Sequence, residues 1–294
     1  MKVLILGAGG MLGHKVWQVF RGRFNCRAAV RVRPSLPLFD DDRVIDGIDA
    51  ADFQSVGKLI ETARPNVVIN CIGVVKQLAA AHDSIASITL NSLLPHVVAR
   101  AGAGVGARMI QVSTDCVFSG TRGNYSETDI PDATDLYGRS KLLGEVTEIE
   151  SSGPAPLTIR TSIIGRELRT ANGLVEWFLS NHGRSVRGFT RAVFSGVTTA
   201  VLAETLANVV EHHPALGGLY HVAARPISKY DLLVMLNETI GGRVVITPDD
   251  RLVIDRSLDA ARFQAATGLV PPSWQEMIAA LAAESPQYER WRTE

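Results

Sequence analysis

The strongest constraint on the fold is a regular alternation of short apolar runs with segments of helical periodicity. The run KVLILG (2–7) is continuous, apolar and ends in glycine, which is typical of a strand buried on both faces. Residues 11–23 have helical spacing, and NCRAAVRV (25–32) is a second strand. This order predicts the α/β class, with a doubly wound parallel sheet and right-handed crossovers.

The same alternation continues to about residue 165 and then loosens. A helix over 50–65 is expected to begin near Asp49 or Asp52. Further helices are predicted at 82–102 and 135–152, and further strands at 66–73, 107–113, 155–165 and 217–224. The later part therefore resembles an appended lobe that interleaves with the first domain.

A glycine-rich turn connects the first strand to the first helix. In GAGGMLG the glycines Gly7, Gly10 and Gly13 follow the pattern G-x-x-G-x-x-G, with Met11 and Leu12 inside the turn. Glycine permits a tight turn and lets backbone N–H groups approach a pyrophosphate at a helix N-terminus. The turn predicts a Rossmann-type dinucleotide site that all five residues help to form, although glycines often only make a turn.

The end of the second strand bears on the choice of cofactor. An NAD site usually has an acidic residue there, which binds the ribose 2′-hydroxyl. This chain has Arg31 and Arg33 and no acid before Asp40. Guanidinium groups suit a 2′-phosphate, so NADP(H) is favoured and NAD(H) stays open. The alternative is that both arginines are only solvated.

The segment LYGRSKLLGE places Tyr137 and Lys141 four residues apart, and therefore on one face of a helix. A phenol has a pKa near 10, and a neighbouring ammonium favours its ionised form. Ser113 and Thr114 follow a predicted strand, at the edge where such sheets bind ligands. The pattern indicates hydride transfer to a ketone, with Tyr137 as acid and a hydroxyl of Thr114, or of Ser113, on the substrate oxygen.

Composition limits the other functions of the chain. Lys and Arg number 30, as do Asp and Glu, so the net charge is zero, which argues against a nucleic-acid binder. The N-terminal run is neither a signal peptide nor a membrane span, and we expect a soluble, cytoplasmic protein. Cys26, Cys71 and Cys116 are scattered, and no cluster has metal-ligand spacing, so no metal is expected.

Several motifs together resemble the extended short-chain dehydrogenase/reductases, and among them the dTDP-4-dehydrorhamnose reductase group. They cover nearly the whole chain and are GAGGMLG, NCIG, STDCVFSG, YSETD, YGRSKLLGE, RTSIIG, GLYHVA and VPPSWQEMI. The resemblance implies a dinucleotide-binding domain at 1–165, to which the chain returns at about 195–225, and a smaller substrate-binding lobe, mainly 166–294.

The resemblance also implies a catalytic set. Thr114 matches the catalytic hydroxyl of the group, Tyr137 the acid/base and Lys141 the ribose-binding lysine. Asn91 matches the asparagine that supports the lysine through water.

Further positions correspond to cofactor contacts in the group. Asp49 matches the residue that usually meets the adenine amine. Cys71, Ile72 and Gly73 would lie on the nicotinamide side of the cofactor.

The implied activity is NADPH-dependent reduction of the 4-keto group of a nucleotide-diphospho-6-deoxy sugar. The substrate is then a nucleotide-diphosphate sugar, and a homodimer stays open. One alternative is a nucleotide-sugar epimerase or dehydratase, although dehydratases usually have Glu where this chain has Cys116. Another is a non-catalytic NADP-binding regulatory subunit, since the regulatory subunit of methionine adenosyltransferase is similar to this group.

At several other positions the chain differs from the group, so the identity of the substrate's sugar stays open. Besides Cys116, where the group usually has Tyr, Ile163 replaces a usual Trp, and the stretches 74–82 and 194–199 differ from the usual forms. Lys76 and Gln77 could reach a sugar or pyrophosphate, or could belong to a solvated loop. Four arginines of the later lobe could bind a diphosphate, namely Arg166, Arg187, Arg191 and Arg256.

Overall fold

The computed structural model describes residues 1–74, 83–150 and 153–293. The chain forms two compact units, each built from three segments. Unit 1 comprises Met1–Thr114, Thr134–Arg160 and Ala203–Tyr220, and unit 2 comprises Asp115–Ala133, Thr161–Leu202 and His221–Glu294. Lys76 and Gln77 lie outside the described residues.

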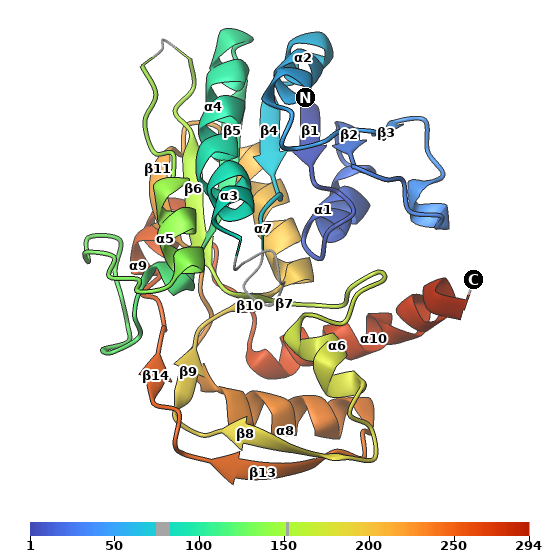
Figure 1. The fold of residues 1–294 in the computed structure, drawn as a ribbon, viewed down its shortest axis with the longest axis vertical. Helices are drawn as coiled ribbons and strands as arrows, with labels where there is room; N and C mark the ends of the chain where they lie inside the picture. The colour runs from blue at the N-terminus through green and yellow to red at the C-terminus, as the bar shows by residue number, and fades with distance from the viewer. Residues whose placement is uncertain (75–82, 151–152, 294) are drawn as a thin grey trace. The chain divides into compact units, whose positions relative to one another are not determined.

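A seven-stranded sheet with helices around it confirms the predicted α/β, Rossmann-type class (Figure 1). Its order is β11-β6-β5-β4-β1-β2-β3, and β1 pairs in parallel with both β2 and β4. The strands are β1 (Lys2–Leu6), β2 (Asn25–Ala29), β3 (Val44–Ile45), β4 (Val67–Asn70), β5 (Arg108–Thr114), β6 (Leu157–Thr161) and β11 (Gly218–His221). The two-residue strand β3 had no signal in the sequence, because it is too short to show a period.

Most predicted helices are present with shorter bounds. They are α1 (Gly13–Phe20), α2 (Phe53–Ala63), α3 (Ser84–Ser87), a π-helical turn (Ile88–Leu93), α4 (Leu94–Gly104) and α5 (Leu136–Leu143). A further helix, α7 (Thr199–His212), has no counterpart among the predicted ones. Asp52, rather than Asp49, caps α2, because its carboxylate accepts the Ser55 N–H. The helix predicted over 135–152 was too long: α5 ends at Leu143, where Gly144 meets the π-helical turn closely.

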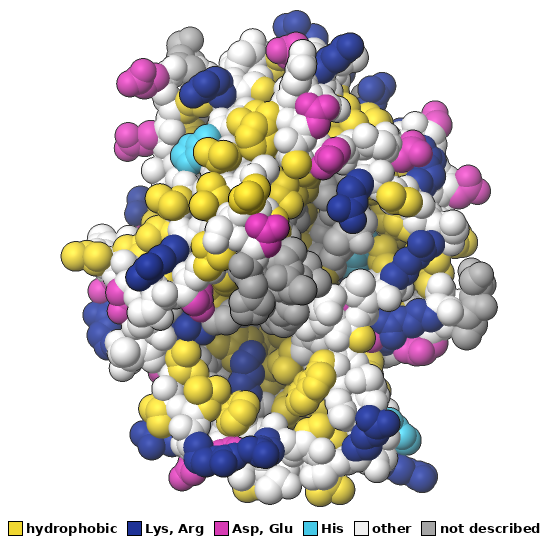
Figure 2. Space-filling view, in the orientation of Figure 1, with side chains coloured by type: hydrophobic (Ala, Val, Ile, Leu, Met, Phe, Trp, Pro, Cys, Tyr) yellow, Lys and Arg dark blue, Asp and Glu magenta, His cyan; other side chains and the backbone are white. Residues whose placement is uncertain are grey.

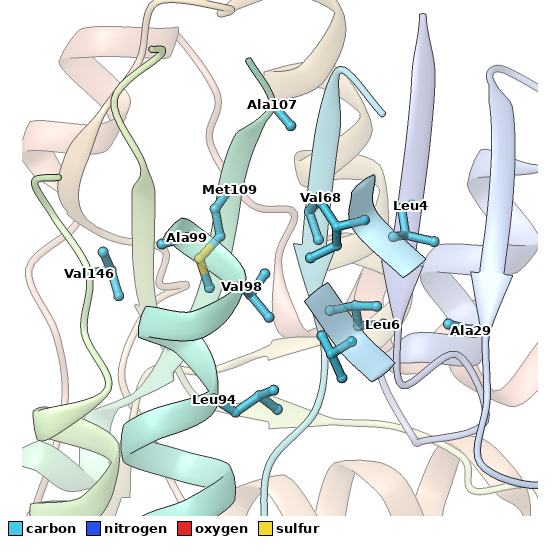
Figure 3. Packing of buried hydrophobic residues seen from close by; sticks show 12 residues of the cluster. Leu4, Leu6, Ala29, Val68, Leu94, Val98, Ala99, Ala107, Met109 and Val146 are labelled. Carbon is cyan, nitrogen blue, oxygen red and sulfur yellow. The ribbon is translucent and has the colours of Figure 1, made fainter. Parts of the chain in front are cut away.

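The core of unit 1 lies between the sheet and helices α2 and α4 (Figure 3). Leu4, Val68 and Met109 are neighbours across β1, β4 and β5, so they form one row on the same face of the sheet. Ile60 of α2 and Val98 of α4 belong to the same buried cluster. Burial of such side chains stabilises the fold by about 1.5–3 kcal/mol each, and it fixes the strand ends that carry the candidate site.

Unit 2 contains small sheets and four helices among its described residues. The sheets have the orders β12-β9-β14, β13-β8 and β10-β7. The strands are β7 (Ile163–Ile164), β8 (Ser185–Phe189), β9 (Ala192–Phe194), β10 (Val197–Thr198), β12 (Ile227–Ser228), β13 (Val245–Asp249) and β14 (Ile254–Asp255). The helices are α6 (Leu174–Leu179), α8 (Lys229–Ile240), α9 (Ala261–Thr267) and α10 (Trp274–Thr293).

A buried ionic cluster connects α6 to α10 within unit 2. The Arg166 guanidinium is 1% exposed and pairs with Glu176 and Glu289, each at 2.6 Å. The Arg292 Nη2 lies 2.7 Å from the other oxygen of Glu176, and the Tyr288 ring lies under the Arg166 guanidinium. Opposite charges and an aromatic face compensate the burial of Arg166.

The described surface carries charges of both signs. On the face seen in Figure 2, Lys and Arg side chains are interspersed with Asp and Glu. Within the described ranges, no helix is both long and apolar enough to cross a membrane, and no group of His, Cys, Asp and Glu could hold a metal ion.

Candidate functional site

The glycine turn has a shape that only small residues permit. Gly7 has φ +78°, and its carbonyl accepts the Gly10 N–H at 3.0 Å. A Cβ on Gly13 would lie 2.1 Å from the same carbonyl oxygen, so a larger residue cannot occupy position 13 without moving the backbone. Leu12, before α1, makes no side-chain cap, which leaves the first N–H groups of the helix without a capping side chain. These features suit an anionic group at this helix N-terminus.

Arg31 and Arg33 differ in what their side chains contact. Arg33 donates to the carbonyl oxygens of Phe39, Asp41 and Val44 and lies 3.5 Å from an Asp46 oxygen. Arg33 therefore holds the loop between β2 and β3 in shape. Arg31 is exposed, and its side chain has no hydrogen bond or ion pair to the described residues. Of the two, Arg31 is the guanidinium that is available to a ligand.

The other predicted cofactor contacts follow β3 and β4. Asp49 is exposed, and its carboxylate accepts the Ala51 N–H at 3.0 Å. Cys71 and Ile72 are half-buried, and burial raises the pKa of the Cys71 thiol to about 12, so the thiol stays neutral. A Cβ on Gly73 would lie 3.1 Å from Asn91 Oδ1 and 3.7 Å from Lys141 Nζ, so the backbone of Gly73 lies beside two candidate catalytic side chains.

Helix α5 carries the predicted Tyr-Lys pair. Asp135 caps the helix by accepting the Gly138 N–H at 2.7 Å, which fixes the register of the first turn. Tyr137 is half-buried, whereas Lys141 is buried and donates to the Val112 carbonyl oxygen at 2.8 Å. Val112 is part of β5, the strand that ends at Thr114. Helix α5 therefore places its ammonium against the strand that carries the predicted hydroxyl.

Asn91 lies in the π-helical turn, and its amide is bonded to two neighbouring segments. Its Oδ1 accepts the Val74 N–H at 2.8 Å, and its Nδ2 donates to the Val74 carbonyl and to Ser140 Oγ. Irregular helical turns of this kind are frequent at functional sites. Asn91 thereby connects the end of β4 to α5, and a water-mediated link to Lys141 stays a prediction.

Glu145 is a residue of the site that sequence reasoning missed. Its carboxylate accepts a hydrogen bond from Ser113 Oγ at 2.6 Å and pairs with Arg160 at 2.7 Å, with both charged side chains buried. The hydroxyl of Ser113 therefore already donates its hydrogen bond within the protein. The available signal was the position of Glu145, four residues after Lys141 and within the helix that the sequence predicted over 135–152.

The protonation of Lys141 depends on burial and on nearby acids. Burial lowers the pKa of Lys141 to about 8, while the negative charge of Glu145 acts in the opposite direction. Near neutral pH the side chain is therefore mostly an ammonium, but one that gives up its proton more readily than an exposed lysine. Such a group can hydrogen-bond ribose hydroxyls and favour ionisation of a nearby phenol.

The four arginines predicted for a diphosphate differ in availability. Arg166 is enclosed in the buried ionic cluster, so we correct the expectation for this residue. Arg187 and Arg191 are exposed, and Arg187 lies 3.7 Å from an Asp249 oxygen. Arg256 is half-buried and donates to the Phe118 carbonyl at 2.8 Å.

A parallel sheet with a glycine turn after its first strand, and a helix that carries Tyr137 and Lys141, define an extended short-chain dehydrogenase/reductase. Residues 1–286 match the family described as the RmlD substrate binding domain. The chain belongs to that family.

Two curated proteins illustrate this relationship. Methionine adenosyltransferase 2 subunit beta from Rattus norvegicus is 32% identical over 159 residues, which cover 54% of this chain and 46% of the relative. The chain thus spans about half the length of this and of several other curated relatives that it matches. A dTDP-4-dehydrorhamnose reductase from Aggregatibacter actinomycetemcomitans is 26% identical over 301 residues, covering 94% of this chain and 97% of that protein.

A solved structure supports the fold. It is dTDP-4-dehydrorhamnose reductase from Bacillus anthracis in complex with NADP, with a TM-score of 0.81 and 21% identity. The match covers 96% of this chain and 99% of the other.

Proposed function

We propose that this chain reduces the 4-keto group of a nucleotide-diphospho-6-deoxy sugar with NADPH. The observation that carries the proposal is the contact of Lys141 with Val112, because it fixes the Tyr137 helix beside the strand that ends at Thr114. The near full-length similarity to dTDP-4-dehydrorhamnose reductases supports the same reaction. The predicted two-domain division, the cytoplasmic location and a homodimer stay predictions.

The residues of unit 1 fit a bound NADPH. The closely packed glycine turn would hold the pyrophosphate, and the exposed Arg31 would meet the 2′-phosphate. Asp49 would contact the adenine, and the backbone at 71–73 would face the nicotinamide. When bound, this cofactor supplies the hydride that reduces the keto carbon.

The side chains of the site would polarise and protonate the oxygen of the same carbonyl group. Thr114 donates a hydrogen bond to the keto oxygen and thereby polarises the carbonyl. Tyr137 gives its phenolic proton to that oxygen, so the carbonyl becomes a hydroxyl and the tyrosine a phenolate. Lys141 binds the ribose and stabilises the phenolate by its positive charge. Asn91 keeps α5 in position through Ser140 and Val74.

Replacement of the phenol tests the proposal. We expect Tyr137→Phe to lower kcat by roughly two orders of magnitude or more while the affinity for NADPH barely changes, because the variant loses only the general acid. The measurement is the loss of NADPH absorbance with dTDP-4-dehydrorhamnose and a panel of related keto sugars. Tyr230→Phe, in α8, is the matched control. Near-normal turnover by Tyr137→Phe would exclude the role given to this residue.

The same assay distinguishes the alternatives. An epimerase or dehydratase would convert the sugar without net loss of NADPH. A regulatory subunit would bind NADPH tightly but would cause no loss of NADPH absorbance with any keto sugar. The match to methionine adenosyltransferase 2 subunit beta over about half of that protein is the reason to include this outcome.

A further inference from the structure

A buried histidine lies beside the glycine turn, and neither the predicted cofactor contacts nor the proposed chemistry use it. His14 is the second residue of α1, and it is fully buried. Its Nδ1 lies 2.9 Å from the Gly10 carbonyl oxygen, which also accepts the backbone N–H of His14 at 3.0 Å. One residue therefore places two nitrogens on the same carbonyl oxygen of the turn.

The position of the imidazole proton follows from the surroundings of His14. Burial lowers the pKa of His14 to about 4, although the hydrogen bond to Gly10 acts in the opposite direction, so the ring is neutral near pH 7. A neutral imidazole carries one N–H, and a carbonyl oxygen can only accept a hydrogen bond. The proton therefore lies on Nδ1, and the ring donates to Gly10.

A fixed Gly10 carbonyl also fixes the direction of the next N–H group. The C=O of Gly10 and the N–H of Met11 belong to one planar trans peptide, in which the two bonds point in opposite directions. Because the carbonyl points along α1 toward His14, the Met11 N–H points away from the helix at its N-terminal end. Within the described residues, this N–H has no acceptor.

The side-chain bond restrains a part of the turn that has few other restraints. Gly9 and Gly10 are exposed, and glycine has more conformational freedom to lose than any other residue. The Gly10 N–H donates to the Gly7 carbonyl at 3.0 Å, so the histidine bonds restrain the other end of the same residue. Donors that are already held in place bind a ligand more tightly, because less freedom is lost on binding.

We infer that His14 is a positioning residue for the cofactor, whose imidazole holds the Gly10–Met11 peptide so that the Met11 N–H faces the pyrophosphate of NADPH. The inference rests on the proposed function, because that function places the pyrophosphate at the glycine turn. The imidazole acts through the backbone and takes no part in the reduction itself.

The test compares two replacements of His14 in a binding measurement that needs no turnover. His14→Leu fills the site but cannot donate, whereas His14→Asn is smaller and carries an N–H group at the position of Nδ1. Calorimetry on the full chain measures the affinities for NADPH and for adenosine 2′-phosphate, which lacks the pyrophosphate. We expect His14→Leu to bind NADPH about fivefold or more weakly, with less than about a twofold change for adenosine 2′-phosphate. His14→Asn should recover most of the NADPH affinity, and His182→Leu, at an exposed position of unit 2, should change neither affinity.

The order of the two variants separates positioning from packing. Because asparagine leaves a cavity, packing alone would make His14→Asn both less stable and the weaker binder of NADPH. Positioning makes it the tighter binder of the two, even if its melting temperature is the lower one. Weaker NADPH binding by His14→Asn than by His14→Leu, equal losses for both ligands, or an unchanged NADPH affinity of His14→Leu would overturn the inference. A wild type that binds no NADPH would overturn the proposed function as well. If instead the expected pattern appears but no keto sugar consumes NADPH, the proposed function fails while the role of His14 stands.

Discussion

At the scale of single residues, one buried carboxylate organises the candidate site. Glu145 accepts from Ser113, pairs with Arg160 and raises the pKa of Lys141 against the effect of burial. Ser113 adjoins Val112, whose carbonyl oxygen binds the Lys141 ammonium. Glu145 thus acts on Lys141 both through its charge and through the strand that the lysine contacts, which makes it a positioning residue.

The lowered pKa of Lys141 predicts a pH dependence. Lys141 has a pKa of about 8 when folded and 10.5 ordinarily, so the unfolded chain holds more protons between these values. The contribution of Lys141 to the free energy of unfolding therefore rises with pH through this window and is smallest below pH 8. Activity should show the opposite trend, because the ammonium is lost: kcat/KM should fall above about pH 8.

The variant Glu145→Gln tests the electrostatic part of this account. Without the carboxylate charge the pKa of Lys141 is lower, so the alkaline limb of kcat/KM should move to lower pH. The pH profile is the measurement, and Glu148→Gln, at an exposed position, is the control. A lower melting temperature with the limb in its original place would mean that Glu145 only stabilises the fold.

At the scale of elements, α5 and the π-helical turn meet without space between them. A Cβ on Gly144 would lie 1.8 Å from the Asn91 carbonyl oxygen. Gly144 does not need glycine for its backbone angles, since its φ is −95°. The requirement is steric, and it sets both the end of α5 and the approach of Asn91 to Ser140.

Gly144→Ala should therefore destabilise the protein by about 1–3 kcal/mol, as overpacking in a well-packed interior does. The measurement is urea unfolding, together with the affinity for NADPH. Gly104→Ala is the matched control, because an added Cβ there meets nothing within 4 Å at the end of α4. That variant should be neutral or slightly stabilised. Equal stability of both alanine variants would contradict the steric account.

At the scale of the whole molecule, local patterns predicted the sheet and the glycine turn but not the partners of individual side chains. Strand and helix periods are local, so β1, α1 and β4 could be recognised from their own residues. The separate roles of Arg31 and Arg33 depend on carbonyl groups of a loop that follows β2. The same holds for the hydrogen bond of the Ser113 hydroxyl, whose acceptor Glu145 lies 32 residues away in the sequence. Tertiary contacts of this kind leave no periodic signal.

Because unit 1 contains a segment that follows residue 165, we predict that residues 1–165 alone cannot fold into this unit. Unit 1 also uses Ala203–Tyr220, where the carbonyl oxygens of His213 and Leu216 accept from the buried Arg108. A chain ending at residue 165 would leave this guanidinium without those acceptors, so it should lack a cooperative urea transition and bind NADPH poorly. A chain ending at residue 225 keeps the segment and is the control. Cooperative unfolding and full affinity of the shorter chain would contradict this view.

The hydrogen bonds from Arg33 to three backbone carbonyl oxygens have a practical consequence for the redesign of coenzyme preference. A substitution of Arg33 would remove the hydrogen bonds that hold the loop after β2. Any change in kcat or KM would then reflect both the altered loop conformation and the lost charge. The Arg31 side chain has no such hydrogen bonds to the described residues, and the backbone carbonyl of Arg31, which accepts the Gly47 N–H, is kept in any substitution. The charge at position 31 can therefore be reversed or removed while the surrounding backbone keeps its conformation. Engineering that begins there reports on electrostatics alone.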